Sequence, residues 1–107
     1  MNFGNMMRQF QKLQEDMERV QEELAEMTVT GTAGGGVVKV VCTGRLEIRQ
    51  VELDPAAVDP DDLEMVQDMI AAAVNDALRK AQELAQAELA KVAGGLKLPN
   101  MPGLPFP

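Results

Sequence analysis

The stretch that most constrains the fold is residues 34–55, which begin with three glycines and are rich in β-branched residues. Five of the seven residues in Val37–Thr43 are β-branched, a composition that favours a strand. Gly44 follows directly and tolerates a positive φ, so we predict a tight hairpin into a second strand over Arg45–Leu53. The stretch therefore predicts the centre of a small antiparallel sheet.

A third, weaker strand is predicted over Thr28–Ala33, before the triple glycine, which supplies a second turn. Three short strands do not fold alone in water unless another element covers an apolar face. The flanking segments must therefore supply helices, and we predict an α+β fold of the order α-β-β-β-α. This three-stranded meander between two long helices occupies a single domain, residues 1–95.

The first predicted helix carries an unbroken heptad pattern of apolar residues. Its positions are Phe3, Met6, Phe10, Leu13, Met17, Val20, Leu24 and Met27. The pattern is typical of a helix that packs against another helix along its whole length. About 25 helical residues span about 37 Å, whereas a short sheet spans about 20 Å. We therefore expect part of this helix to project beyond the sheet and to contribute to a homodimer.

The second predicted helix covers about Pro60–Ala93, with Asp59 as its N-cap and Gly94-Gly95 as its stop signal. We expect its buried stripe to be Leu63, Val66, Ile70, Val74, Ala77, Ala81, Leu84 and Ala85. A metal site at the neighbouring aspartates is the alternative, but helix capping accounts for them and no histidine accompanies them. Residues 96–107 contain four prolines and are predicted to form a disordered tail.

Composition argues against an enzyme. The chain has no His, Ser, Tyr or Trp, and its single cysteine, Cys42, lies among valines and is predicted to be buried. Residues 34–36 are not a phosphate-binding loop, because no Lys-Ser/Thr ending or helix follows them. We predict no cofactor, no metal and no small-molecule substrate. There is also no apolar run long enough for a membrane span, so we expect a cytoplasmic protein without a membrane partner.

Two segments resemble a known bacterial family. They are Gly31-Thr-Ala-Gly-Gly-Gly-Val-Val-Lys-Val40, with a glycine turn before a strand, and Ala71-Ala-Ala-Val-Asn-Asp-Ala-Leu-Arg-Lys-Ala81 within the second helix. Found in this order, they are similar to the YbaB/EbfC family over roughly residues 3–93. The resemblance implies a homodimeric nucleoid-associated protein without a catalytic site, whose helices project like the arms of tweezers. It makes double-stranded DNA and a second copy of the chain the expected partners.

The charges are unevenly distributed, which matters because the net charge of −7 opposes DNA binding at first sight. Residues 51–76 hold eight acids and no base, whereas residues 1–14 hold two bases and no acid. We predict DNA contacts from the helix cations Arg8, Lys12, Arg19, Arg79, Lys80 and Lys91, with the strand cations Lys39, Arg45 and Arg49 as a competing patch.

The predicted function is binding of duplex DNA mainly through phosphates, with little sequence specificity, in association with the nucleoid. The alternative is a helical protein-interaction or chaperone-like module, because eight methionines provide an adaptable apolar surface. Salt separates the two functions: DNA affinity through phosphates falls steeply as the salt concentration rises, whereas apolar binding does not.

Overall fold

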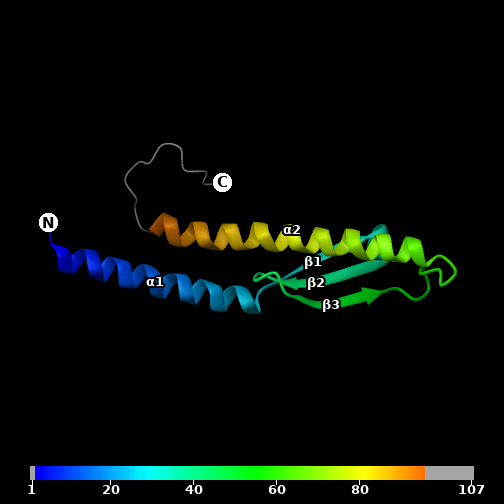
Figure 1. Ribbon diagram of the computed structural model, residues 1–107, viewed down its shortest axis with the longest axis horizontal. Coiled ribbons are helices and arrows are strands. Elements are labelled where there is room, and N and C mark those ends of the chain that lie inside the picture. The colour runs from blue at the N-terminus through cyan, green and yellow to red at the C-terminus, as the bar shows by residue number, and fades with distance from the viewer. Residues whose placement is uncertain (1, 96–107) are drawn as a thin grey trace, which may run out of the picture.

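The computed structural model describes residues 2–95 and shows an elongated molecule, 70 × 27 × 16 Å, built from two long helices and one small sheet (Figure 1). The elements in chain order are α1 (Phe3–Glu26), β1 (Thr28–Ala33), the 3₁₀ turn η1 (Gly34–Gly36), β2 (Val38–Thr43), β3 (Ile48–Leu53) and α2 (Leu63–Gly95). The predicted α+β fold of helix, three strands and helix is confirmed. Residues 96–107, for which a tail was predicted, lie outside the described residues.

The sheet is antiparallel with the strand order β1-β2-β3. β1 pairs with β2 in a register that runs from Thr28 opposite Thr43 to Ala33 opposite Val38. The three glycines of η1 make the connection with φ angles of 63°, 70° and 100°. Glycine reaches this left-handed region without steric cost, so the predicted glycine turn is confirmed and has a backbone reason.

The connection between β2 and β3 is longer than the predicted tight hairpin. β3 begins at Ile48 rather than Arg45, and residues 44–47 form the turn. The residue with positive φ is Leu46, at 65°, and not Gly44. Buried Thr43 holds the turn closed, because its Oγ1 accepts hydrogen bonds from the amides of Arg45 (3.2 Å) and Glu47 (3.3 Å).

α2 lies along one face of the sheet, over β1 and β2 (Figure 1). The core between them consists of Val38, Val40, Cys42, Ala73, Ala77 and Ala81. Alanines on the helix and Gly31 on β1 allow a close approach: a Cβ on Gly31 would lie 2.3 Å from the Ala73 carbonyl oxygen. The predicted stripe omitted Ala73, and it wrongly included Leu63, which is 62% exposed because it lies in the first turn of α2.

The start of α2 was predicted about three residues too early. The Asp59 carboxylate accepts a hydrogen bond from the Asp61 amide (2.9 Å), and residues 59–62 form a turn that includes Pro60. Asp62 then caps the helix, since its Oδ1 accepts a hydrogen bond from the Met65 amide at 3.2 Å. The capping role assigned to Asp59 therefore belongs to Asp62, because the turn already uses the Asp59 side chain. At its other end α2 includes both glycines of the predicted stop signal.

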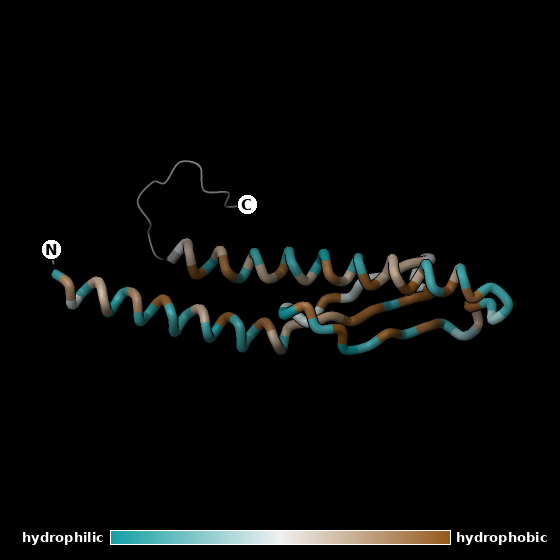
Figure 2. Tube along the Cα trace, viewed as in Figure 1, coloured by the Kyte–Doolittle hydropathy of each residue, from teal (hydrophilic) through white to brown (hydrophobic). Residues whose placement is uncertain are grey.

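α1 extends beyond the sheet and lies beside the second half of α2 (Figure 1). The inner end of its heptad pattern is buried within the chain, with Val20 and Leu24 at 4% and 1% exposure. Leu24 packs on the β2–β3 turn, where a Cβ on Gly44 would lie 2.7 Å from its Cδ2. The outer end, from Phe3 to Phe10, is exposed, although apolar residues recur along it (Figure 2).

Among residues 2–95, neither helix combines the length and the apolar character that crossing a bilayer requires.

Candidate nucleic-acid interface

The antiparallel packing of α1 and α2 brings cations from the two ends of the chain together. Lys12 and Arg19 of α1 and Lys91 of α2 line one hollow of about 470 Å³ between the helices. The remaining lining residues are Gln9, Asp16, Val20, Glu23, Glu88 and Val92. Three of the predicted DNA-binding cations thus share one surface, on the part of the molecule that lies beyond the sheet.

The cations at this end of the molecule differ in whether a carboxylate forms an ion pair with them. Arg19 Nη1 lies 3.0 Å from Asp16 Oδ1. Lys91 Nζ lies 2.9 Å from Glu88 Oε1. Such exposed pairs contribute about 0–1 kcal/mol each to stability. Arg8 and Lys12 have neither an ion pair nor a hydrogen bond within residues 2–95. Among the helix cations, Arg8 and Lys12 are therefore the two that no carboxylate of the described residues pairs with directly.

Arg79 and Lys80 lie over the sheet, beside the edge strand β1, and not at the helix tips. Lys80 Nζ donates to the Thr30 carbonyl oxygen at 3.1 Å, and both cations pair with the Asp76 carboxylate. Asp76 Oδ2 also accepts a hydrogen bond from the Thr32 amide at 3.0 Å. This backbone hydrogen bond, followed by the bond from Lys80, lowers the pKa of Asp76 below its ordinary value. The cluster therefore ties α2 to the outer edge of β1.

The strand cations do not join the helix cations. Lys39 is exposed on the face of the sheet away from α2, since its neighbours along β2 are buried in the core, and Arg45 lies in the β2–β3 turn. Arg49 Nη2 donates to the Ala25 carbonyl oxygen at 3.0 Å. The last carbonyls of a helix lack partners within the helix, so Arg49 satisfies one at the end of α1. Sequence reasoning missed this role, because the two residues are distant in the chain.

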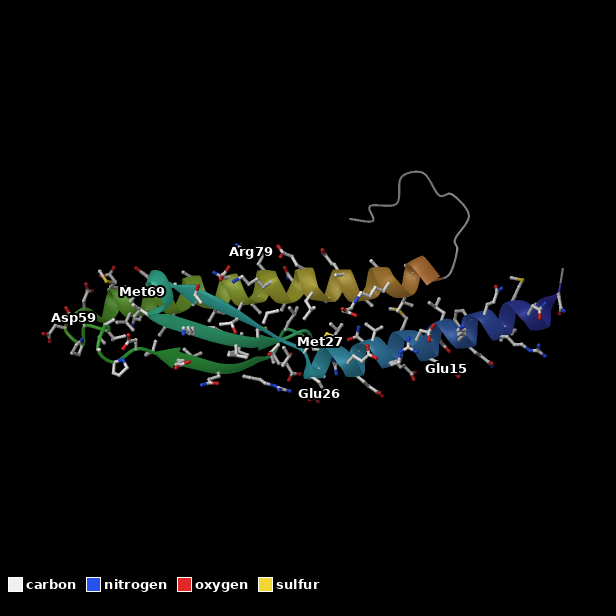
Figure 3. All side chains as sticks on the ribbon, turned by 180° about the vertical axis from the view of Figure 1, so that it is seen from behind. Glu15, Glu26, Met27, Asp59, Met69 and Arg79 are labelled. Carbon is white, nitrogen blue, oxygen red and sulfur yellow. The ribbon has the colours of Figure 1, made fainter. Side chains whose placement is uncertain are left out.

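The two ends of the molecule carry opposite charges. Asp59 lies at the end where α2 begins, and the start of α1 lies at the other end (Figure 3). Residues 51–76 contain eight acids and no base, and most of these acids lie at the end of the molecule where α2 begins. The acid-free start of α1 is therefore far from the acidic block, and a polyanion can approach it with little repulsion from that block.

Comparisons with known proteins identify the family of the chain. Residues 1–96 match the model of the YbaB/EbfC DNA-binding family. A protein of Acetivibrio thermocellus called a nucleoid-associated protein is 57% identical over 103 residues, covering 96% of this chain and 89% of the relative. A protein of the same description from Pelotomaculum thermopropionicum is 55% identical, with 94% and 95% covered.

The fold also has a solved counterpart. The crystal structure of an uncharacterized Helicobacter pylori protein aligns with a TM-score of 0.77, covering 88% of this chain and 99% of that one. At 21% identity this likeness bears on the fold alone. The match of the family model over all of the described residues, together with the identities above, decides the assignment. The chain belongs to the YbaB/EbfC DNA-binding family.

Proposed function

We propose that this protein binds duplex DNA as a homodimer, mainly through phosphate contacts and with little sequence preference, and that it associates with the nucleoid. The observation that carries the proposal is the pair Arg8 and Lys12, which has no carboxylate partner within residues 2–95 and lies on the acid-free end of α1. Family membership and the description of the relatives support DNA as the partner.

Helix geometry supports a common face for these cations. Arg8 and Lys12 are four residues apart, so their side chains neighbour one another. Arg19 follows Arg8 by eleven residues, or about three helical turns, which returns it to nearly the same face. Lysines and arginines without ion pairs can contact phosphates and release counterions without first breaking an interaction inside the protein.

The strand cations are a weaker candidate for the same task. Arg49 is already engaged with the end of α1, which leaves Lys39 and Arg45 on separate parts of the sheet and turn. Glu52 pairs in register with Lys39 on the neighbouring strand and reduces the positive potential there. We therefore assign the phosphate contacts to the helix side of the molecule.

Fluorescence anisotropy of a labelled duplex, measured over a series of salt concentrations, tests this assignment. The double variant Arg8→Ala/Lys12→Ala is compared with Lys39→Ala/Arg45→Ala, which removes the same charge from cations that also lack ion pairs within residues 2–95. We expect the helix variant alone to lose affinity, with a salt slope shallower by about 0.9 for each phosphate that the protein no longer neutralises. Loss of affinity in the Lys39→Ala/Arg45→Ala variant alone would assign the phosphate contacts to the strand cations instead. Failure of the parent protein to bind DNA at low salt would refute DNA binding.

The homodimer has a physical basis in the exposed face of β3. Ile48, Val51 and Leu53 lie on the same side of the sheet as the core residues of β2 but are not covered, and Val51 is 45% exposed. Leu46 in the adjoining turn is exposed as well. A run of exposed apolar residues on one face of an edge strand favours an interface. A second copy is the natural occupant, because a two-fold axis lets the same patch cover itself.

The two edges of the sheet differ in a way that supports this choice. Asp76 and Lys80 bond to the Thr32 amide and the Thr30 carbonyl on the outer edge of β1. In the described part of the chain, no other element bonds to the backbone on the outer edge of β3. The heptad pattern of α1 is a poorer interface than expected from sequence, since its inner residues are already buried within the chain. Light scattering should report twice the 11.6 kDa chain mass; a stable monomer would refute the dimer.

A further inference from the structure

Strand β1 forms an edge of the sheet, but its own sequence has none of the features that usually stop an edge from pairing with another chain. Edge strands are commonly protected by a lysine or a proline, by a bulge, or by being very short. β1 has no charged residue and no proline, is six residues long, and pairs with β2 without a register shift. Its valine and three threonines also favour a strand. Protection of this edge is therefore left to another element.

Two side chains of α2 supply that protection. Lys80 Nζ donates to the Thr30 carbonyl oxygen at 3.1 Å, and Asp76 Oδ2 accepts a hydrogen bond from the Thr32 amide at 3.0 Å. Both backbone groups lie on the outer edge of β1, where an added strand would form its hydrogen bonds. Lys80 Nζ also lies 3.1 Å from Asp76 Oδ2, so the two side chains hold each other in place over the edge. We call them the Asp76–Lys80 pair.

The close packing of α2 on β1 brings the pair within reach of the strand backbone. Gly31 lies between Thr30 and Thr32, and a Cβ on it would lie 2.3 Å from the Ala77 amide nitrogen. Because Gly31 has no side chain, α2 rests directly on β1 (Figure 1), and the short side chain of Asp76 reaches the strand. Hydrogen bonds to ionised groups are about twice as strong as those between neutral groups. The pair therefore competes well with a neutral backbone partner from another chain.

We propose that the outer edge of β1 is a strand-pairing surface for β1 of a second copy, and that the Asp76–Lys80 pair keeps this surface closed. A second copy is the occupant that β1 favours, because two uncharged strands meet without repulsion and a two-fold axis lets each one pair with the other. With the edge open, a dimer formed through β3 grows into larger assemblies, since each chain then binds two others. A chain that did not dimerise through β3 would form dimers instead, so the inference stands apart from the proposed function.

Amide hydrogen exchange, followed by NMR, tests whether the pair closes the edge. In the parent protein we expect the Thr32 amide to exchange more slowly than the Thr30 amide, which lies on the same edge. Asp76→Ala should speed exchange at Thr32 on the order of tenfold, because it removes the acceptor. Arg79→Ala is the matched control, since Arg79 pairs with Asp76 but has no hydrogen bond to β1 within residues 2–95. Equal exchange at Thr32 in Asp76→Ala and the parent would refute the closure.

Sedimentation velocity over a series of protein concentrations tests the pairing surface itself. We expect Asp76→Ala/Lys80→Ala to form species larger than the parent assembly, with a mass that rises with concentration, whereas Arg79→Ala should match the parent. Adding Thr30→Pro should return the double variant to the parent mass, because proline removes an outward amide and blocks pairing at an edge. Circular dichroism checks that each variant is folded. Lys80→Gln is the milder variant if the double variant does not fold, and the same rise in mass is expected of it.

Two results would overturn the proposal. If a folded variant without the pair keeps the parent mass at every concentration, the pair only fastens α2 to the sheet and the edge of β1 is not a pairing surface. If larger species form but persist after Thr30→Pro is added, they arise from another surface of the molecule.

Discussion

Gly31 is the point at which a single added methyl group should disturb the packing of the molecule most. It lies in β1 directly beneath α2, and its missing side chain allows the helix to rest on the strand. In Gly31→Ala the new Cβ would lie 2.3 Å from both the Ala73 carbonyl oxygen and the Ala77 amide nitrogen. Both are backbone atoms of a regular helix, so no side-chain rotation can relieve the overlap.

The size of the effect follows from these distances. Non-bonded carbon contacts are most favourable at about 3.5–4.0 Å, so α2 must move away by about 1 Å or more. That movement loosens the alanine contacts with β2 across the whole core. Overpacking of a core costs about 1–3 kcal/mol, and the rigid backbone places this site at the upper end, about 3 kcal/mol. For a domain of this size, the thermal midpoint should fall by about 12–24 °C.

Thermal unfolding followed by circular dichroism measures this fall. All proteins must be compared at one concentration, because self-association makes the midpoint depend on concentration. Gly94→Ala is the control, since a Cβ there has no atom within 4 Å and alanine favours the helix. A Gly31→Ala midpoint within about 3 °C of the parent, which corresponds to less than about 1 kcal/mol, would refute the close packing of α2 on β1.

Five further changes have distinct expected outcomes. Folding lowers the pKa of Asp76, so its stabilising contribution is present above pH 4 or so and is lost as the pH falls through the folded value. Asp76→Asn should therefore lower the urea midpoint at pH 7 and lose less stability on acidification; equal acid losses would contradict this. Leu24→Ala should cost about 2–4 kcal/mol in denaturant unfolding because Leu24 is buried, whereas Phe3→Ala should stay within about 0.5 kcal/mol; equal costs would contradict the observed burial. Val51→Asp should convert the proposed dimer into folded monomers in sedimentation velocity, and a variant that stays dimeric would exclude the β3 face. Deletion of residues 96–107 should leave the thermal midpoint nearly unchanged, and a large fall would show that this segment contributes to the fold.

Local patterns were sufficient to predict the elements. The heptad pattern of α1 ended within one residue of the observed helix, and β1 has the predicted bounds, Thr28–Ala33. Helix periodicity and β-branched composition depend on residues that are close together in the chain, so both can be recognised from the sequence alone. The glycine turn of η1 was predictable for the same reason, since positive φ is a property of the residue itself.

The candidate site was only partly predictable. The pair Asp16–Arg19 follows from its spacing of three residues on a helix, which can be read from the sequence. The shared hollow of Lys12 and Lys91 depends on the antiparallel arrangement of two helices that are far apart in the chain. The contact of Lys80 with β1 likewise needs the placement of α2 on the sheet.

What the sequence by itself determined is the set of helices and strands, the positions of its glycines and the separation of its charges into blocks. Tertiary structure alone decided what those residues contact. Gly44 was predicted as a turn residue with positive φ, yet it is constrained by Leu24 of α1, and Leu46 takes the left-handed conformation instead. Arg49, one of the strand cations, bonds to the end of α1, a role that its place in the sequence does not indicate. Both outcomes follow from contacts between residues about 20 or more positions apart, and such contacts leave no periodic signal in the sequence.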